Sequence, residues 1–146
     1  MTPEQKPRTV VVSGAASGFA QRIEVGAHSF TADEPASDGG TDTGPNPYDL
    51  LLAALGSCTS MTVALYARRK QWALQSVTVR LQHSKVHAAD CESCETKDGR
   101  IDRIEREIEL DGALEQYQRD RLLEIANKCP VHRTLTSKID IRTRLA

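Results

Sequence analysis

Aromatic residues are scarce in this chain. Phe, Trp and Tyr make up 4% of its 146 residues, so aliphatic side chains must form most of any core. A charge excess of either sign is also missing, since 19 basic and 20 acidic residues leave a net charge of −1. Nucleic acids and anionic membranes attract basic surfaces, and neither is expected as a partner.

Long apolar segments are also missing from the chain. No apolar run approaches the roughly 20 residues that span a bilayer, and the N-terminus lacks the longer apolar stretch of a signal peptide. We therefore expect a soluble, cytoplasmic protein. Its length suits one ordinary domain, which we place at residues 9–146, preceded by a polar tail over residues 1–8 that contains two prolines.

Short apolar segments separated by glycines predict three strands near the N-terminus, over residues 10–12, 19–25 and 28–32. The two-residue turn Gly26-Ala27 favours an antiparallel meander. A turn-rich loop over residues 33–46 follows, and loops of this length inside a domain more often serve a site.

A strong helix start stands at residues 46–49. Asn46 suits the N-cap, Pro47 suits the first helical position, and Asp49 suits the positive end of the helix dipole. The helix should run through Lys70, and no charge occurs between Leu50 and Leu65. Such a helix must be buried on nearly every side, which suggests that a second subunit helps to cover it.

The rest of the chain predicts two strands, a helix and a closing strand. Residues 101–110 also show helical spacing, but the glycines around them favour a strand. The predicted order is βββ-α-ββ-α-β, an α+β fold with antiparallel sheets. The later segments are residues 76–81, 101–110, 113–128 and 137–144.

Four cysteines form an isolated pair, Cys58 and Cys129, and a C-x-x-C pair, Cys91 and Cys94. Alone, Cys58 reads most simply as a small buried apolar residue. Cys129 has His132 and Arg133 nearby, and cationic neighbours favour thiolate. The isolated pair would suit a nucleophile and a resolving partner, although spacing alone does not show that they meet.

The C-x-x-C pair follows two histidines, in the pattern His83, His87, Cys91, Cys94. The simplest interpretation is a solvated hairpin tip whose cysteines are free or form a local disulfide. Two imidazoles and two thiolates could also form a tetrahedral zinc site. A redox role coupled to Cys58 is a third alternative, and we predict no metal site.

Three segments together resemble the OsmC/Ohr family of osmotically inducible and organic hydroperoxide resistance proteins, and its OsmC-like branch most closely. The resemblance covers essentially residues 9–146 and rests on TGPNPYDLLLAALGSCTSMTV, RIDRIEREIEL and LLEIANKCPVHRTL. It implies intertwined α+β homodimers with central apolar helices and active sites at the subunit interface. It also implies reduction of organic hydroperoxides by thiols, without metal or flavin.

Carried over by motif, the resemblance makes Cys58 the peroxidatic cysteine and Cys129 the resolving cysteine. The well-studied enzymes place a Glu ten residues before the peroxidatic cysteine, where this chain has Tyr48, followed by Asp49. They place an essential Arg in a turn that corresponds to residues 15–17, where this chain has no basic residue. Arg22 is the nearest substitute, so Cys58, Cys129, Arg22 and Asp49 are the candidate catalytic residues.

Two functions follow as expectations. The first is a homodimeric, thiol-dependent peroxidase that acts on organic hydroperoxides, uses an external dithiol reductant and needs no cofactor. The second is a protein that binds a small apolar or electrophilic ligand in the same pocket; the missing Arg favours it, whereas the retained cysteine pair favours the peroxidase. Hydrolysis by Cys58 is a distant third, because no histidine accompanies Cys58 in the sequence.

Overall fold

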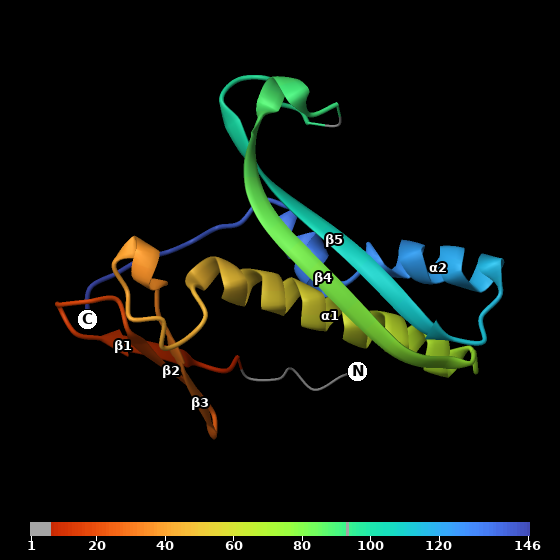
Figure 1. Cartoon of the computed structure of the whole chain (residues 1–146), viewed down its shortest axis with the longest axis horizontal. Coiled ribbons are helices and arrows are strands. Elements are labelled where there is room, and N and C mark those ends of the chain that lie inside the picture. Colours follow the sequence, from red (N-terminus) through yellow and green to blue (C-terminus); the bar gives the residue numbers. More distant parts are fainter. Residues whose placement is uncertain (1–6, 93) are drawn as a thin grey trace. The chain divides into compact units, whose positions relative to one another are not determined.

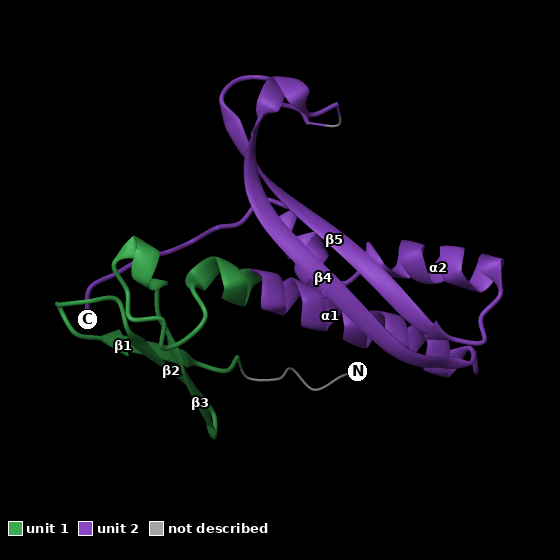
Figure 2. Ribbon diagram, viewed as in Figure 1, with its two compact units in different colours: residues 1–51 green, residues 52–146 purple. Residues whose placement is uncertain are grey.

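The computed structural model describes residues 7–92 and 94–146 (Figure 1). The chain divides into two compact units, one up to Leu51 and the other Leu52–Ala146 (Figure 2). Most of the tail predicted at residues 1–8 lies outside the described residues, and Pro7 and Arg8 have no regular secondary structure. That residues 9–146 form one domain stays a prediction.

The first unit contains the predicted antiparallel meander. Strands β1 (Val10–Gly14), β2 (Gln21–Val25) and β3 (His28–Ala32) pair in chain order. The turn between β2 and β3 is the predicted pair Gly26-Ala27, with Gly26 at φ 56°, in the left-handed region that glycine enters without strain.

The turn-rich loop after β3 is organised by one buried carboxylate. Asp33 is 2% exposed and accepts hydrogen bonds from the backbone N–H groups of Glu34, Thr41 and Thr43 and from both threonine hydroxyls, at 2.6 to 3.2 Å. These bonds hold the pKa of Asp33 far below its ordinary value of 3.8. The loop also contains the short 3-10 helix η1 (Ala36–Asp38).

Helix α1 (Pro47–Arg69) begins where the sequence predicts. The Asp49 N–H donates to Asn46 Oδ1 at 2.8 Å, and the Asn46 N–H donates to Asp49 Oδ2 at 3.0 Å. This reciprocal cap satisfies backbone donors that have no partner inside the helix. Arg68 and Arg69 end the helix, where cations suit its dipole.

By length and composition alone, α1 could also cross a membrane, with a mean hydropathy of 1.7 over 18 residues. The sequence analysis did not recognise this, because the apolar residues are interrupted by Gly, Ser and Thr. One such helix is weak support for a membrane protein, since core helices of soluble proteins meet the same criteria.

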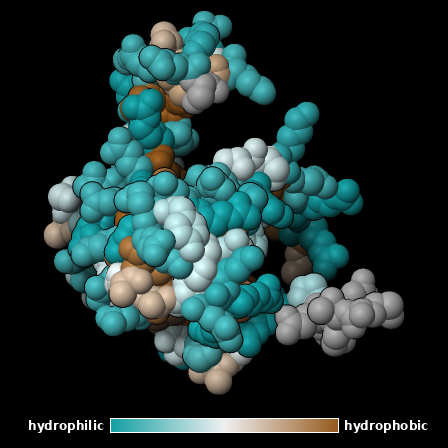
Figure 3. Space-filling model, turned by 90° about the vertical axis from the view of Figure 1, so that its right-hand side faces the viewer, coloured by the Kyte–Doolittle hydropathy of each residue, from teal (hydrophilic) through white to brown (hydrophobic). Residues whose placement is uncertain are grey.

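The second unit contains a long antiparallel hairpin of β4 (Leu74–His87) and β5 (Arg100–Gly112), which crosses α1 in Figure 1. The strand interpretation of residues 101–110 is confirmed, although both strands are longer than predicted. Half-buried residues alternate with exposed ones, and Figure 3 shows apolar surface on the stem below the polar tip. Gly56 of α1 lies so close to β4 that an added Cβ would stand 2.8 Å from Leu81 Cδ1.

The core of the second unit joins α1 to α2 (Gln116–Ala126). Its fully buried members are Val63, Ala67, Leu122 and Ala126, and apolar residues of both hairpin strands pack against them. After α2 the chain turns at Cys129 into the short helix α3 (Pro130–Leu135).

The closing strand predicted at residues 137–144 is wrong for the single chain. The structure ends its regular elements with α3 and leaves residues 138–146 without secondary structure. Ile139 and Ile141 are 57% and 82% exposed. A strand needs a neighbouring strand for its backbone hydrogen bonds, and no strand among residues 7–92 and 94–146 pairs with this segment.

Candidate active site

The two isolated cysteines meet in the second unit. Cys58 lies within α1 and is half-buried, whereas Cys129 lies between α2 and α3 and is 0% exposed. Both thiols are free, and Cys58 is near enough to help lower the pKa of the Cys129 thiol. The two residues are 71 positions apart in the chain and are brought near each other because the α2–α3 turn packs on α1, where Thr59 Oγ1 lies 3.7 Å from Cys129 Sγ.

The surroundings of Cys129 favour its thiolate form. Burial alone raises its pKa, but the backbone N–H of His132, the Thr59 hydroxyl, the Cys58 thiol and the positive charge of Arg106 together outweigh burial and lower the pKa. The His132 N–H donates to Cys129 Sγ at 3.4 Å, and Thr59 Oγ1 lies 3.7 Å from the sulfur.

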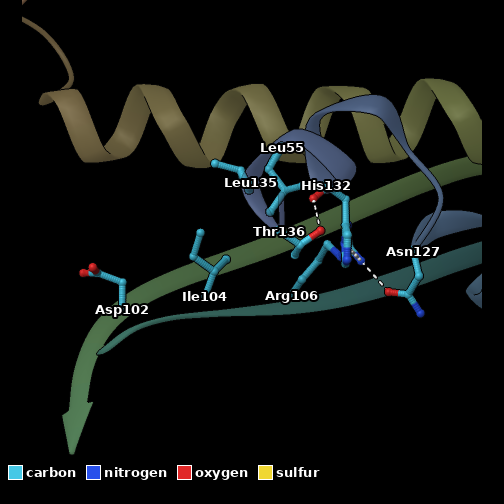
Figure 4. Close-up of a pocket in the computed structure, with 8 residues that line it drawn as sticks. All are labelled: Leu55, Asp102, Ile104, Arg106, Asn127, His132, Leu135 and Thr136. Carbon is cyan, nitrogen blue, oxygen red and sulfur yellow. Dashed lines mark hydrogen bonds between the residues drawn. The ribbon is translucent and has the colours of Figure 1, made fainter. Parts of the chain in front are cut away.

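Arg106 connects three elements around this sulfur. Its Nη1 donates to Thr59 Oγ1 at 2.9 Å, and its Nη2 donates to Asn127 Oδ1 at 2.8 Å and to His132 Nδ1 at 3.2 Å. Figure 4 shows the guanidinium beside His132, with its bond to Asn127. These contacts fix the Arg106 side chain, which comes from β5, between α1, the end of α2 and α3.

His132 is not a cationic partner for Cys129, which corrects the sequence interpretation. Burial, and then the charge of Arg106, lower the pKa of the imidazole, so the ring is neutral near pH 7. Its Nδ1 accepts from Arg106, which places the ring proton on Nε2. The neighbouring Arg133 is exposed. The cation near Cys129 is Arg106, which comes from another element.

A cavity of about 430 Å³ lies beside this network (Figure 4). Asn127 and Asp102 lie at opposite ends of the view, with Arg106 and His132 nearer Asn127. Neither cysteine lines the cavity, and Arg106 and His132 connect it to Cys129. The cavity therefore combines an apolar wall with one guanidinium. Its lining consists of Leu55, Asp102, Ile104, Arg106, Asn127, His132, Leu135 and Thr136.

Arg22 and Asp49, the two other candidate catalytic residues, belong to the first unit. Arg22 lies on β2, where its Nε donates to Glu24 Oε1 at 3.0 Å and its side chain is 64% exposed. Asp49 accepts the Asn46 N–H at the start of α1. Asp49 therefore has a structural task as a helix cap, and the roles of both residues toward Cys58 stay predictions.

Cys91 and Cys94 are bonded to each other in a disulfide at the tip of the β4–β5 hairpin. This matches the local-disulfide alternative. His83 lies 2.8 Å from a carboxylate oxygen of Asp102, to which its Nε2 is hydrogen-bonded. Within residues 7–92 and 94–146, no three side chains among His, Cys, Asp and Glu are grouped as metal ligands.

Sequence reasoning missed Thr59 and Arg106. Thr59 is next to Cys58 but has no distinguishing pattern. Arg106 did leave a signal, since it interrupts the alternation of Ile104, Ile108 and Leu110 on the inner face of β5. A charge in such a row is costly unless it has partners, so the interruption indicates a buried polar site on that face.

Comparison with known proteins agrees with the fold. The sequence profile of the family described as OsmC-like protein matches residues 40–144. No curated protein is similar to the chain at a significant level. Among solved structures, an organic hydroperoxide resistance protein from Elizabethkingia anophelis superposes with a TM-score of 0.67 at 18% identity, covering 95% of this chain and 94% of that one.

Two further structures superpose in the same way. An organic hydroperoxide resistance protein OsmC from Legionella pneumophila has a TM-score of 0.65 at 19% identity, covering 92% of this chain and 93% of that one. The organic hydroperoxide resistance protein OhrB of Bacillus subtilis has a TM-score of 0.62 at 20% identity, covering 92% and 94%. At these identities the likeness shows the fold.

Proposed function

Because the chain belongs to the OsmC-like protein family, we propose that it is a thiol-dependent peroxidase that reduces organic hydroperoxides through Cys58 and Cys129. The nearness of the two free thiols supports this proposal most directly. Two cysteines that lie near each other can pass from sulfenic acid to disulfide with little rearrangement of the fold. The names of the superposed structures agree with this chemistry.

The proposed cycle assigns different steps to the two sulfurs. The Cys58 thiolate attacks the distal peroxide oxygen, the O–O bond breaks, and the leaving alkoxide takes a proton to become the alcohol. Cys58 is then a sulfenic acid. The Cys129 thiolate attacks the Cys58 sulfur, water leaves after one protonation, and a disulfide remains. An external dithiol reduces this disulfide and becomes a disulfide itself.

The exposure of the two cysteines determines which of them attacks the peroxide first. Cys58 is half-buried and can meet a peroxide, whereas Cys129 has no exposed surface. The first attack therefore belongs to Cys58, although the pKa of the Cys129 thiol is lowered. Within the proposal, Arg22 and Asp49 stay candidate catalytic residues, since they are the nearest substitutes in the sequence for the Arg and the Glu of the well-studied enzymes. The protein acts as a cytoplasmic homodimer, without metal or flavin.

Mass spectrometry after one equivalent of tert-butyl hydroperoxide tests the proposal. We expect a Cys58–Cys129 disulfide in the wild type. In Cys129→Ser we expect sulfenic or overoxidised Cys58, because nothing resolves the first product. Hydrogen peroxide is the matched control and should react more slowly. First oxidation at a reduced Cys91 or Cys94, or no oxidation of Cys58, would contradict the proposal.

The cavity favours a second candidate function. Its lining of Leu55, Ile104 and Leu135 suits a small apolar ligand beside Arg106. If Cys58 stays reduced under organic hydroperoxide, then binding of a small apolar or electrophilic molecule becomes the better interpretation. An apolar ligand of suitable size should then raise the Tm of the protein, whereas a polar analogue of the same size should not.

A further inference from the structure

Cys58 and Cys129 differ in their exposure and in the hydrogen-bond donors around them. This difference bears on how a disulfide between them would be reduced. Cys129 is enclosed by donors and is 0% exposed, whereas Cys58 is half-buried. We propose that Arg106 and Thr59 hold Cys129 as the leaving thiolate when the disulfide is reduced, so that the external dithiol attacks only Cys58. This inference rests on the proposed function in one respect, since it takes the Cys58–Cys129 disulfide as the oxidised state.

The Thr59 hydroxyl can adapt to both charge states of Cys129. Its Oγ1 lies 2.7 Å from the Leu55 carbonyl oxygen and 3.7 Å from Cys129 Sγ, and it carries one hydrogen. When Cys129 is a thiol, Thr59 donates to Leu55 and the S–H can donate to Thr59. When Cys129 becomes a thiolate, the hydroxyl can turn and donate to the sulfur.

Arg106 supports the second arrangement. It donates to Thr59 Oγ1 in either state, which polarises the hydroxyl toward donation. The other acceptors of Arg106 are the Asn127 amide oxygen and a neutral imidazole nitrogen. No carboxylate lies within ion-pair distance of Arg106 in the described part of the chain. A thiolate at Cys129 therefore supplies a balancing charge.

The reduction step follows from these positions. A thiolate of the dithiol attacks Cys58 Sγ and forms a mixed disulfide. The Cys58–Cys129 bond breaks, and its electron pair stays on Cys129 Sγ. The second thiol of the reductant then attacks its own sulfur in the mixed disulfide and releases Cys58 as thiolate. Exchange is faster when the departing thiolate is stabilised, and the His132 N–H, the Thr59 hydroxyl and Arg106 are placed to stabilise a thiolate at Cys129.

A trapping experiment identifies the attacked sulfur. Diamide oxidises the wild-type protein to the disulfide without any peroxide, so the test stays valid even if peroxide is not a substrate. Excess 2-mercaptoethanol then opens the disulfide, iodoacetamide blocks free thiols, and mass spectrometry locates both groups. We expect the 2-mercaptoethanol adduct on Cys58 and the alkylated thiol on Cys129. An adduct on Cys129, or an even division between the two, would overturn the inference.

Variants test the roles of Arg106 and Thr59, which act as positioning residues. Reduction of the diamide-formed disulfide by dithiothreitol should slow about three- to tenfold in Arg106→Gln and in Thr59→Val, because the leaving thiolate loses a nearby positive charge in the first variant and a hydroxyl donor in the second. Thr59→Ser keeps the hydroxyl and should restore the rate, and Arg106→Lys should restore part of it.

Arg80→Gln is the matched control, because Arg80 lies on the same hairpin and its ion pairs with Glu107 and Glu109 are exposed. It should reduce at the wild-type rate. Circular dichroism checks that each variant is folded. If Thr59→Ser is as slow as Thr59→Val, or if folded Arg106→Gln is as fast as wild type, the two residues do not hold the leaving thiolate.

Discussion

Single buried polar groups organise both units of this protein. In the first unit Asp33 gathers five hydrogen bonds from its loop. In the second unit Thr59 is 0% exposed and links α1, Cys129 and Arg106. Buried acceptors of this kind are costly to leave unsatisfied, so each makes its surroundings sensitive to a change of one atom.

Asp33 gives the fold a definite acid dependence. Its pKa in the folded protein is far below the ordinary 3.8, so the ionised carboxylate stabilises the fold fully above that pH. This contribution is lost as the pH falls below 3.8 toward the folded value. In Asp33→Asn the amide group replaces an acceptor with a donor, and Tm at pH 7 should fall by about 3–8 °C.

The measurement compares thermal unfolding of wild type and Asp33→Asn between pH 7 and pH 2.5. The difference in Tm should shrink at the acid end, because Asp33 takes up a proton in the unfolded wild type below about pH 3.8 while it stays ionised in the fold, which lowers the stability of the wild type. Asp38→Asn removes an exposed carboxylate of the same loop and should leave Tm nearly unchanged. A difference between wild type and Asp33→Asn that grows toward low pH would contradict this account.

For single residues, the sequence was enough to predict the pair of cysteines, but it did not identify the cation near Cys129. The motifs around Cys58 and Cys129 indicated a pair, and the structure brings the two thiols together. The cation was assigned to His132 and Arg133 because they are adjacent in the chain. The actual cation, Arg106, reaches Cys129 through the packing of β5 against α1 and α3. Only tertiary structure reveals that proximity.

At the scale of elements, sequence reasoning succeeded where one segment carries its own signals. Asn46 and Pro47 located the start of α1, and Gly26 located the first hairpin turn. The strand predicted at residues 137–144 failed for the opposite reason. Alternating apolar and polar residues show that a segment could join a sheet, but they do not show that a neighbouring strand is present to pair with it.

The packing of α2 on α1 can be tested with two adjacent leucines. Leu122 is 1% exposed and packs with Val63, Ala67 and Ala126, whereas Leu123 is 56% exposed. Leu122→Ala should lower the free energy of unfolding by about 2–5 kcal/mol, because it leaves a cavity in the core. Leu123→Ala should change it by about 0.5 kcal/mol or less.

Urea unfolding followed by circular dichroism measures both free energies. Equal changes in the free energy of unfolding would show that α2 does not pack on α1 through the face that contains Leu122. Since Cys129 follows α2 directly, a loosened α2 should also slow formation of the Cys58–Cys129 disulfide in Leu122→Ala.

At the scale of the whole molecule, a large apolar surface remains uncovered. Only 28% of the most apolar 18-residue stretch of α1 is buried within the chain. Met61 is 72% exposed and Leu65 is 41% exposed, one turn apart on the helix that carries Cys58. Apolar residues gathered on one helix face indicate an interaction surface. A second copy of the chain is the partner we propose, as the sequence analysis expected.

The C-terminal segment provides the sharpest test of the proposed dimer. Ile139 and Ile141 are 57% and 82% exposed, although their spacing would put both on the buried face of a half-buried strand. Pairing with a second copy would supply the missing neighbour and cover both side chains. The wild type should therefore sediment at twice the 16.1 kDa mass of the chain at micromolar concentration.

Replacing both isoleucines by Gln should weaken this dimer about tenfold or more, since each isoleucine loses apolar burial. Lys138→Gln with Arg142→Gln is the matched control, because these side chains would lie on the opposite face of such a strand; it should sediment like wild type. Sedimentation velocity over a range of concentrations measures the dissociation constant of each variant. A folded wild-type monomer at micromolar concentration would refute the dimer. Equal weakening by both pairs of substitutions would instead mean that the segment contributes without a specific buried face.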